Sequence, residues 1–324
     1  MNTIGIDVSK EKLDCAWLRE QDKLKTKVVI NKPSGWQALL DWALKNTGLA
    51  VEQLFFVMEA TGIYHEQLAM FLFNQGAKVS VVNPAQIKFY AQSLGVRSKN
   101  DKKDSVVLAR YGLKENPAPW QPEAPEIHEL KALLARFDAL EKDLQREKNR
   151  HEKAEIALAP AAVTRSITQM IDALDIERQE LDKLIEEHIK KHKQLKDNKD
   201  LLESIPAVGK VIATRMLMVI GSRQFDEASQ CAAYLGLVPV QHQSGSSVQG
   251  RAKLSKAGNP IIRAKLYRAA VVAIRYNPDI KAQYERLTNK GKSKMSALGA
   301  AMRKLVHICF GVLKHQQPYQ PQAA

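Results

Sequence analysis

Four carboxylates are the residues of this chain whose types and context suggest chemistry: Asp7, Glu59, Asp101 and Asp104. Asp7 and Glu59 each belong to an apolar run that is otherwise suited to a buried strand, and Asp101 and Asp104 are one helical turn apart. A buried acid is costly unless a partner neutralises it. Acids that converge from two strand ends and a helix can hold two Mg²⁺ ions, which clamp a phosphodiester and its attacking group. Each acid alone could be an ordinary solvated side chain, but the order and context of all four favour a metal site.

The composition indicates a globular protein with a polyanionic partner. The 324 residues suffice for two or three domains, and 45% of them are hydrophobic. The formal charge of +14 favours nucleic acid over an acidic membrane surface. No apolar stretch is expected to approach the roughly 20 residues that span a bilayer, and no secretory signal is apparent. Three scattered cysteines, without metal-ligand spacing, suit a reducing cytoplasm.

The first ~120 residues alternate strand-like and helix-like patterns. Strands are expected near residues 3–8, 13–18, 27–31, 53–59 and 78–83. Helices are expected near residues 34–46, 63–75 and 101–114, with Ser34 as the N-cap of the first. Three strands followed by alternating helices and strands predict an α/β layer with a mixed sheet, in the order of a ribonuclease-H-like fold. In such a fold the first strand, the fourth strand and a late helix bring their acids to one edge of the sheet.

The rest of the chain is predicted to be mostly helical. Residues 116–125 contain four prolines and indicate a linker. Two charged helices with an apolar stripe are expected at ~126–158 and ~164–196, and Pro160 between them predicts an antiparallel hairpin that packs on itself or on a second subunit. The predicted domains are 1–124, 125–199 and 200–324.

The third region combines a turn, a polar loop and a basic block. Residues 201–213 resemble a helix-hairpin-helix, whose turn presents N–H groups to a phosphate, although Ala207 stands where glycine is usual. A helical hairpin that merely packs is the alternative. Residues 241–250 form a Ser/Gly loop, and from Ser244 to Lys304 there are 14 Lys or Arg against two acids. A segment with so many positive and so few negative side chains is more than the charged face of an ordinary solvated helix.

Several short motifs carry a resemblance to a known family. They are Gly5-Ile-Asp-Val-Ser-Lys10, Met58-Glu-Ala-Thr-Gly-Ile-Tyr64, Val82-Asn-Pro-Ala85, Asn100-Asp-Lys-Lys-Asp104, Gly236-Leu-Val-Pro239, Ser244-Gly-Ser-Ser247 and Leu254-Ser-Lys-Ala-Gly-Asn259. Together they resemble the DEDD insertion-sequence transposases, the one-hundred-and-ten family, which is related to Piv-type DNA invertases. The likeness covers essentially the whole chain.

The resemblance implies a RuvC-like N-terminal domain, a coiled-coil middle and a C-terminal transposase domain. It implies a bacterial, cytoplasmic enzyme that recombines donor and target DNA as a dimer or tetramer, guided by a structured bridge RNA. Asp7, Glu59, Asp101 and Asp104 match the family's acids for Mg²⁺, and Ser244 matches its nucleophilic serine, which forms a 5′-phosphoserine intermediate. The family's usual Thr-Asp-x-x-Asp-Ala reads Asn100-Asp-Lys-Lys-Asp-Ser105 here, with both acids retained.

Basic side chains near these motifs are candidate contacts to nucleic acid. They are Lys99, Lys102, Lys210, Arg251, Lys253, Lys256, Arg263, Arg268, Lys292, Lys294, Arg303 and Lys304. Three other functions remain as alternatives. A Holliday-junction resolvase would use the same acids with water as nucleophile and would not need Ser244. A sugar-kinase-like ATPase would need a second glycine-rich phosphate loop, which the first 120 residues lack, and a non-catalytic scaffold would not need four placed acids.

Overall fold

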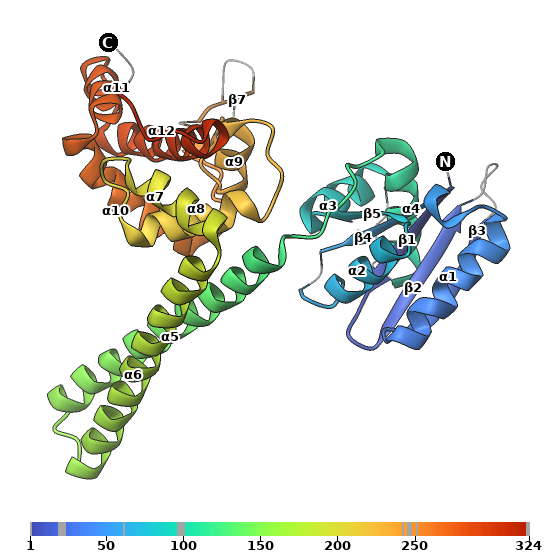
Figure 1. The fold of residues 1–324 in the computed structure, drawn as a ribbon, viewed down its shortest axis with the longest axis horizontal. Coiled ribbons are helices and arrows are strands. Elements are labelled where there is room, and N and C mark those ends of the chain that lie inside the picture. The colour runs from blue at the N-terminus through green and yellow to red at the C-terminus, as the bar shows by residue number, and fades with distance from the viewer. Residues whose placement is uncertain are drawn as a thin grey trace. The chain divides into compact units, whose positions relative to one another are not determined.

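The chain divides into two compact units, Met1–Pro122 and Glu123–Ala324 (Figure 1). The computed structural model describes residues 2–18, 24–60, 62–95, 101–241, 243–244, 248–250 and 252–321. Within these ranges, the side chains of residues 101, 102, 243, 244, 248 and 249 are outside the description.

A five-stranded mixed sheet forms the centre of the first unit, in the spatial order β3-β2-β1-β4-β5. The strands are β1 Asn2–Val8, β2 Lys12–Leu18, β3 Leu24–Ile30, β4 Leu54–Glu59 and β5 Lys78–Val82. β1, β2 and β3 are antiparallel neighbours, whereas β4 runs parallel to β1 and β5 runs parallel to β4. Helix α1 (Pro33–Thr47) and the short helix η1 (Val51–Gln53) connect β3 to β4. The predicted mixed sheet, with three consecutive strands before the first helix, is confirmed.

The two faces of this sheet pack against different helices. Even-numbered residues of β1, such as Ile4 and Ile6, lie in a core with α1 and α2 (Glu66–Asn74). Val57 of β4 lies in the core of the opposite face, together with residues of α3 (Pro84–Ser93) and α4 (Asp101–Glu115). Because side chains alternate along a strand, the odd-numbered residues of β1 and β4 belong to the α4 face.

The helices differ from the sequence prediction at several places, and two of these differences have a local cause. The residue before α1 is Lys32, which makes no side-chain cap, and the helix begins at Pro33 because the fixed φ of proline suits the first turn. Ser34 as the N-cap is therefore wrong. Helix α3 was not predicted, because its apolar pattern is short, although Asn83 before it caps the helix by accepting from Ala85 N at 2.8 Å.

The proline-rich connector packs on the sheet before it reaches the second unit. Ser80 Oγ donates to Ala118 O at 3.0 Å, and Trp120 N donates to Val79 O at 2.7 Å. The Trp120 ring also meets Phe73 edge-on, with the ring centroids 6.0 Å apart. The segment predicted as a linker is thus held to β5 as far as Trp120.

The second unit begins with two long helices, α5 (Pro125–Ile156) and α6 (Ala161–Lys191), which lie side by side (Figure 1). Pro160 precedes α6, so the predicted break is present. The rest is a bundle of α7 Lys193–Glu203, α8 Lys210–Gly221, α9 Ala228–Tyr234, α10 Pro260–Tyr276, α11 Pro278–Asn289 and α12 Lys294–His315. One apolar core joins the base of α5 and α6 to this bundle.

Helix α12 packs against α7, α9, α10 and α11. It is the one described helix whose length and apolar composition would suffice to cross a membrane, and 56% of its apolar window is buried in the protein. The expectation that no apolar stretch approaches this length does not hold for α12. A helix that is covered by several neighbours needs apolar residues on most of its circumference.

The turn between α7 and α8 contains Ala207 with φ of +76°. This left-handed conformation favours glycine, because a Cβ is strained there. The backbone therefore has the conformation for which glycine is usual at this position of a helical hairpin.

The three cysteines are free and buried. Burial raises the pKa of each thiol, to about 12 for Cys231. Thiols that stay protonated are poor nucleophiles, so these cysteines have a packing role in the core.

A prediction concerns Gly5, where α4 lies directly on β1. A Cβ on Gly5 would collide with the backbone of α4, including the carbonyl carbon of Leu108 at 2.9 Å. Gly5→Ala is therefore expected to lower the free energy of unfolding by about 1–3 kcal/mol, measured by urea denaturation. In the control Gly311→Ala, the new Cβ meets nothing within 4 Å, and helix propensity predicts a small gain. Equal stability of the two variants would contradict this packing.

Candidate active site

Asp7 and Glu59 lie next to each other at one edge of the sheet. Ile6 of β1 is opposite Met58 of β4 in a parallel pairing, so the next residue on each strand is an acid. Both acids are odd-numbered and belong to the α4 face, and both side chains are half-buried. The pairing of strands therefore brings together two acids that are 52 positions apart in sequence.

Helix α4 runs antiparallel to β1 across this face. Gly112 in its last turns packs on Thr3, whereas Ser105 and its neighbours pack on Gly5. Two residues of a strand span about 6.6 Å, and four residues of a helix span about 6 Å. Continuing the same progression brings the first turn of α4 to Asp7.

That first turn contains Asp101 and Asp104. The Asp104 side chain is half-buried, and Asp101 is described by its backbone alone. Asp7, Glu59 and Asp104 each take part in a polar interaction. Among the described side chains, no three of the His, Cys, Asp and Glu type form a group that could hold a metal ion. The backbone thus brings the four predicted acids to one edge of the sheet. The three carboxylates whose side chains are described do not form a group that could hold a metal ion.

A fifth carboxylate at this edge, Asp14, was missed by the sequence reasoning. Asp14 of β2 is directly opposite Asp7 and shares its face. It is 8% exposed, and Lys12 Nζ lies 3.0 Å from its Oδ2. Like charges directly opposite each other destabilise a sheet unless a cation neutralises them. The available signal was the same as for Asp7, namely an acid within a strand that is otherwise buried.

Ser244 belongs to a small β arm in the second unit. β6 (Pro239–Val240) pairs with β9 (Lys253–Leu254), and between them β7 (Gln243–Ser244) pairs with β8 (Val248–Gln249). Ser244 is opposite Val248. Residues 245–247 and the Ser244 side chain lie outside the described part, so the arm defines the backbone position of the serine only.

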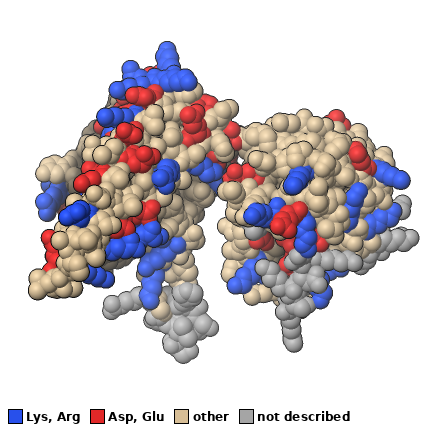
Figure 2. Space-filling model, turned by 90° about the horizontal axis from the view of Figure 1, so that it is seen from below, with Lys and Arg blue, Asp and Glu red and all other residues tan. Residues whose placement is uncertain are grey.

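The predicted basic contacts have different environments. Lys99, Arg251 and the Lys102 side chain are outside the described part. Six of the others are exposed: Lys210, Lys253, Lys256, Arg268, Lys292 and Lys294. Arg303 and Lys304 on α12 are half-buried, with Arg303 Nε 3.4 Å from His307 Nε2. Figure 2 shows Lys and Arg side chains scattered over both units, with Asp and Glu between them.

Two of the predicted contacts hold parts of the protein together. Lys210 Nζ, at the start of α8, lies 2.7 Å from Asp182 Oδ2 and 3.5 Å from Glu186 Oε1 on α6. Burial lowers the pKa of Lys210, but the hydrogen bond to Asp182 and the charge of Glu186 outweigh it and raise that pKa. Arg263 donates to the backbone carbonyl of Gly258. Binding of a phosphate by either side chain stays a prediction.

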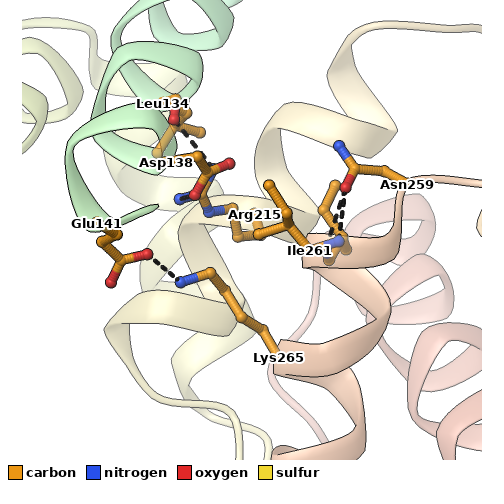
Figure 3. Close-up of polar contacts among 8 residues, drawn as sticks. Leu134, Asp138, Glu141, Arg215, Asn259, Ile261 and Lys265 are labelled. Atoms are coloured by element: carbon orange, nitrogen blue, oxygen red, sulfur yellow. Dashed lines mark hydrogen bonds and ion pairs between the residues drawn. The ribbon is translucent and has the colours of Figure 1, made fainter. Parts of the chain in front are cut away.

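Two further pairs join α5 to the bundle (Figure 3). The buried Arg215 guanidinium on α8 donates to both carboxylate oxygens of Asp138, with Nη1 2.9 Å from Oδ2. Burial raises the pKa of Asp138, and the charge of Arg215 opposes that rise. Lys265 Nζ on α10 lies 2.8 Å from Glu141 Oε2. These pairs link α5 to α8 and α10 of the bundle.

Comparison with known proteins gives consistent matches over most of the chain. Residues 4–154 match the DEDD transposase domain of the IS110 type, and residues 199–285 match the "Transposase IS116/IS110/IS902 family". The chain is 33% identical to the pilin gene-inverting protein of Moraxella bovis, over 98% of this chain and 97% of that protein. It is 26% identical to the transposase for insertion sequence element IS1111A of Coxiella burnetii, over 82% and 79% of the two chains.

The chain is also similar to solved structures. Thermus thermophilus RuvC matches with 15% identity and a TM-score of 0.27, covering 37% of this chain and 100% of that chain. The fold and the family matches together define a DNA-processing enzyme of the transposase class. The chain belongs to the IS110 family of transposases, as its motifs predict.

A prediction concerns the Arg215–Asp138 pair. Arg215→Gln leaves the half-buried Asp138 carboxylate without its paired cation and is expected to lower the free energy of unfolding by about 3–5 kcal/mol in urea denaturation. The matched control is Arg146→Gln, which removes an exposed pair with Asp143 on α5 and should have little effect. If both variants unfold at the same urea concentration as the unchanged protein, the pair does not hold α5 to the bundle.

Proposed function

We propose that this protein is a metal-dependent DNA recombinase that moves or inverts DNA segments by serine attack on a phosphodiester. The observation that carries the proposal is the meeting of Asp7, Glu59 and the first turn of α4 at one sheet edge. The strand order of the first unit supports a ribonuclease-H-like, RuvC-like catalytic domain. We further propose three functional domains at residues 1–124, 125–199 and 200–324, with a coiled coil in the middle.

The donor set suits a hard divalent cation such as Mg²⁺, because it consists of carboxylate oxygens. Asp7, Glu59, Asp101 and Asp104 would hold the ions, and the facing pair of Asp7 and Asp14 is a further reason for a cation at this edge. When bound, such ions polarise the scissile phosphate and stabilise the leaving 3′-oxygen.

Ser244 is the proposed nucleophile. Its Oγ forms a bond to the scissile phosphorus, the bond from phosphorus to the 3′-oxygen breaks, and the serine proton is passed to that leaving oxygen. The products are a 5′-phosphoserine and a free 3′-hydroxyl. In strand exchange, a 3′-hydroxyl from the other DNA attacks the phosphoserine and returns the proton to Ser244, so the number of phosphodiester bonds is conserved.

The acids belong to the first unit and Ser244 belongs to the second. This division supports an active site that is completed between two subunits of a dimer or tetramer, so that cleavage waits for assembly with DNA. The exposed lysines of the second unit, including Lys292 and Lys294, would contact phosphates.

Sequence choice is proposed to come from a structured bridge RNA. A basic surface gives salt-dependent affinity without base discrimination. The sequence contains no recognisable zinc finger or helix-turn-helix to read bases. Pairing between an RNA and the two DNAs would supply that discrimination and would account for the net charge of +14.

The first prediction from this function concerns the acids. Glu59→Gln and Asp104→Asn are nearly isosteric, so the fold and DNA binding should persist while strand cleavage falls below detection. Isothermal titration with Mg²⁺ in the presence of nucleic acid should show weaker binding in both variants. The metal site is rejected if Mg²⁺ binds to them as it does to the unchanged protein.

A second prediction identifies the nucleophile. Ser244→Ala should abolish a protein–DNA adduct that survives denaturing electrophoresis, because the proposed bond to phosphorus is formed by Ser244 Oγ. The matched control Ser246→Ala, two residues away in sequence, should keep the adduct. An adduct that persists in Ser244→Ala excludes Ser244, and the absence of any adduct together with hydrolytic cleavage would favour a resolvase that uses water.

A third prediction concerns RNA. Protein freed of RNA should bind DNA weakly, with little discrimination, and should not recombine donor and target plasmids. Adding the non-coding transcript of the element should restore recombination, and changes in its pairing loops should redirect the target. Efficient site-specific recombination by RNA-free protein would contradict RNA guidance.

A further inference from the structure

The loop that follows Glu59 carries exposed apolar side chains at the edge of the sheet where the acids lie. Ile63 is 71% exposed and Tyr64 is 42% exposed. Two adjacent large apolar residues in a loop are costly to leave in water, and aromatic residues on functional loops commonly bind ligands. Their position directly after β4, and not their exposure alone, makes them informative.

Asn31, at the end of β3, fixes this loop. Its Nδ2 donates to Ser9 O at 2.9 Å and to Tyr64 O at 3.1 Å, while its Oδ1 accepts from Trp36 Nε1 at 2.8 Å. The indole N–H can only donate, so this contact decides which end of the amide faces the loop. All three bonds are satisfied together, and the backbone of Tyr64 is thereby tied to the ends of β1 and β3.

The same bonds place Tyr64 close to the acids. Ser9 is two residues beyond Asp7, a path of about 7 Å along the chain. Tyr64 O and Ser9 O share one nitrogen, so the loop backbone at Tyr64 stands beside the end of β1. A nucleic-acid strand whose phosphate reaches Asp7 would present its neighbouring nucleotides to this loop, within a few steps of about 3.4 Å each.

We propose that Tyr64, flanked by Ile63, is a stacking platform for an unpaired base of the DNA strand next to the cleaved phosphate, and that Asn31 is its positioning residue. The inference rests on the proposed function, because that function brings the strand to the acids. Stacking on an aromatic ring accepts any base. The platform would therefore hold the strand in place without reading its sequence.

The test is the affinity for a mixed-sequence single-stranded DNA, measured by fluorescence anisotropy in EDTA at low and at raised salt. Raised salt weakens the contribution of the basic surface. Tyr64→Ala should weaken binding about 5- to 100-fold, Tyr64→Phe should bind as the unchanged protein, and Tyr64→Leu should lose most of the affinity. Tyr276→Ala is the matched control, because Tyr276 is 70% exposed at the end of α10, in the other unit, and should bind normally.

Asn31 is tested by a double-mutant cycle. Asn31→Ala should weaken binding when Tyr64 is present and add little in the Tyr64→Ala background, because it acts through the loop. A purely structural effect would lower affinity equally in both backgrounds and would overturn the positioning role. Thermal unfolding of each variant checks that the fold is retained.

The platform is rejected if Tyr64→Ala binds DNA as the unchanged protein, if Tyr64→Phe is as weak as Tyr64→Ala, or if only an RNA oligonucleotide responds to these changes. Failure of the proposed catalytic site would show separately, as cleavage that persists in Glu59→Gln. The binding measurement in EDTA involves no cleavage, so the two results are distinguishable.

Discussion

The close approach of α4 to β1 is the constraint on which the candidate site depends. Gly5 has no Cβ, so the helix backbone lies directly on the strand, and Gly112 allows a second close contact near the other end of the helix. Two contacts fix both the direction and the register of a helix on a sheet. The first turn of α4 is thereby held at Asp7, although nearly a hundred residues separate them in the chain. A larger residue at either glycine would lift the acids of α4 away from those of the sheet.

Charge is used in two ways in this protein. In the second unit, buried or half-buried cations are paired with acids of the long helices, as Arg215 is with Asp138 and Lys265 with Glu141. Such pairs hold elements together, because separating either partner would leave a charge in an apolar setting. Lys292 and Lys294 are instead exposed around the start of α12. The number of Lys and Arg residues is thus no measure of the number of phosphate contacts, since some of these cations have a structural role.

Several acids gather at the sheet edge. Asp7 and Asp14 face each other across two strands, with Lys12 paired to Asp14 and Glu59 beside Asp7. This arrangement costs stability in the absence of further positive charge. Proteins accept such a cost where function requires it. A cation and the phosphate that it binds would relieve the repulsion, which is consistent with an enzyme that is complete only when assembled on DNA.

The sequence by itself predicted the succession of strands along the chain, the mixed sheet, the two long helices and the family, because strand alternation, helical periodicity and short motifs are local signals. It also singled out Asp7 and Glu59 as candidate site residues, since an acid in an apolar run is visible without a structure. Only the tertiary structure decided that Asp14 faces Asp7, that Lys210 pairs with Asp182, that Asn31 holds the Tyr64 loop and that α12 lies inside a bundle. Those facts depend on strand register and on contacts between residues far apart in the chain, which local patterns do not encode. The short helix α3 and the start of α1 at Pro33 were missed for a different reason. Their local signals are brief, and the sequence alone was compatible with other helix boundaries until packing selected one.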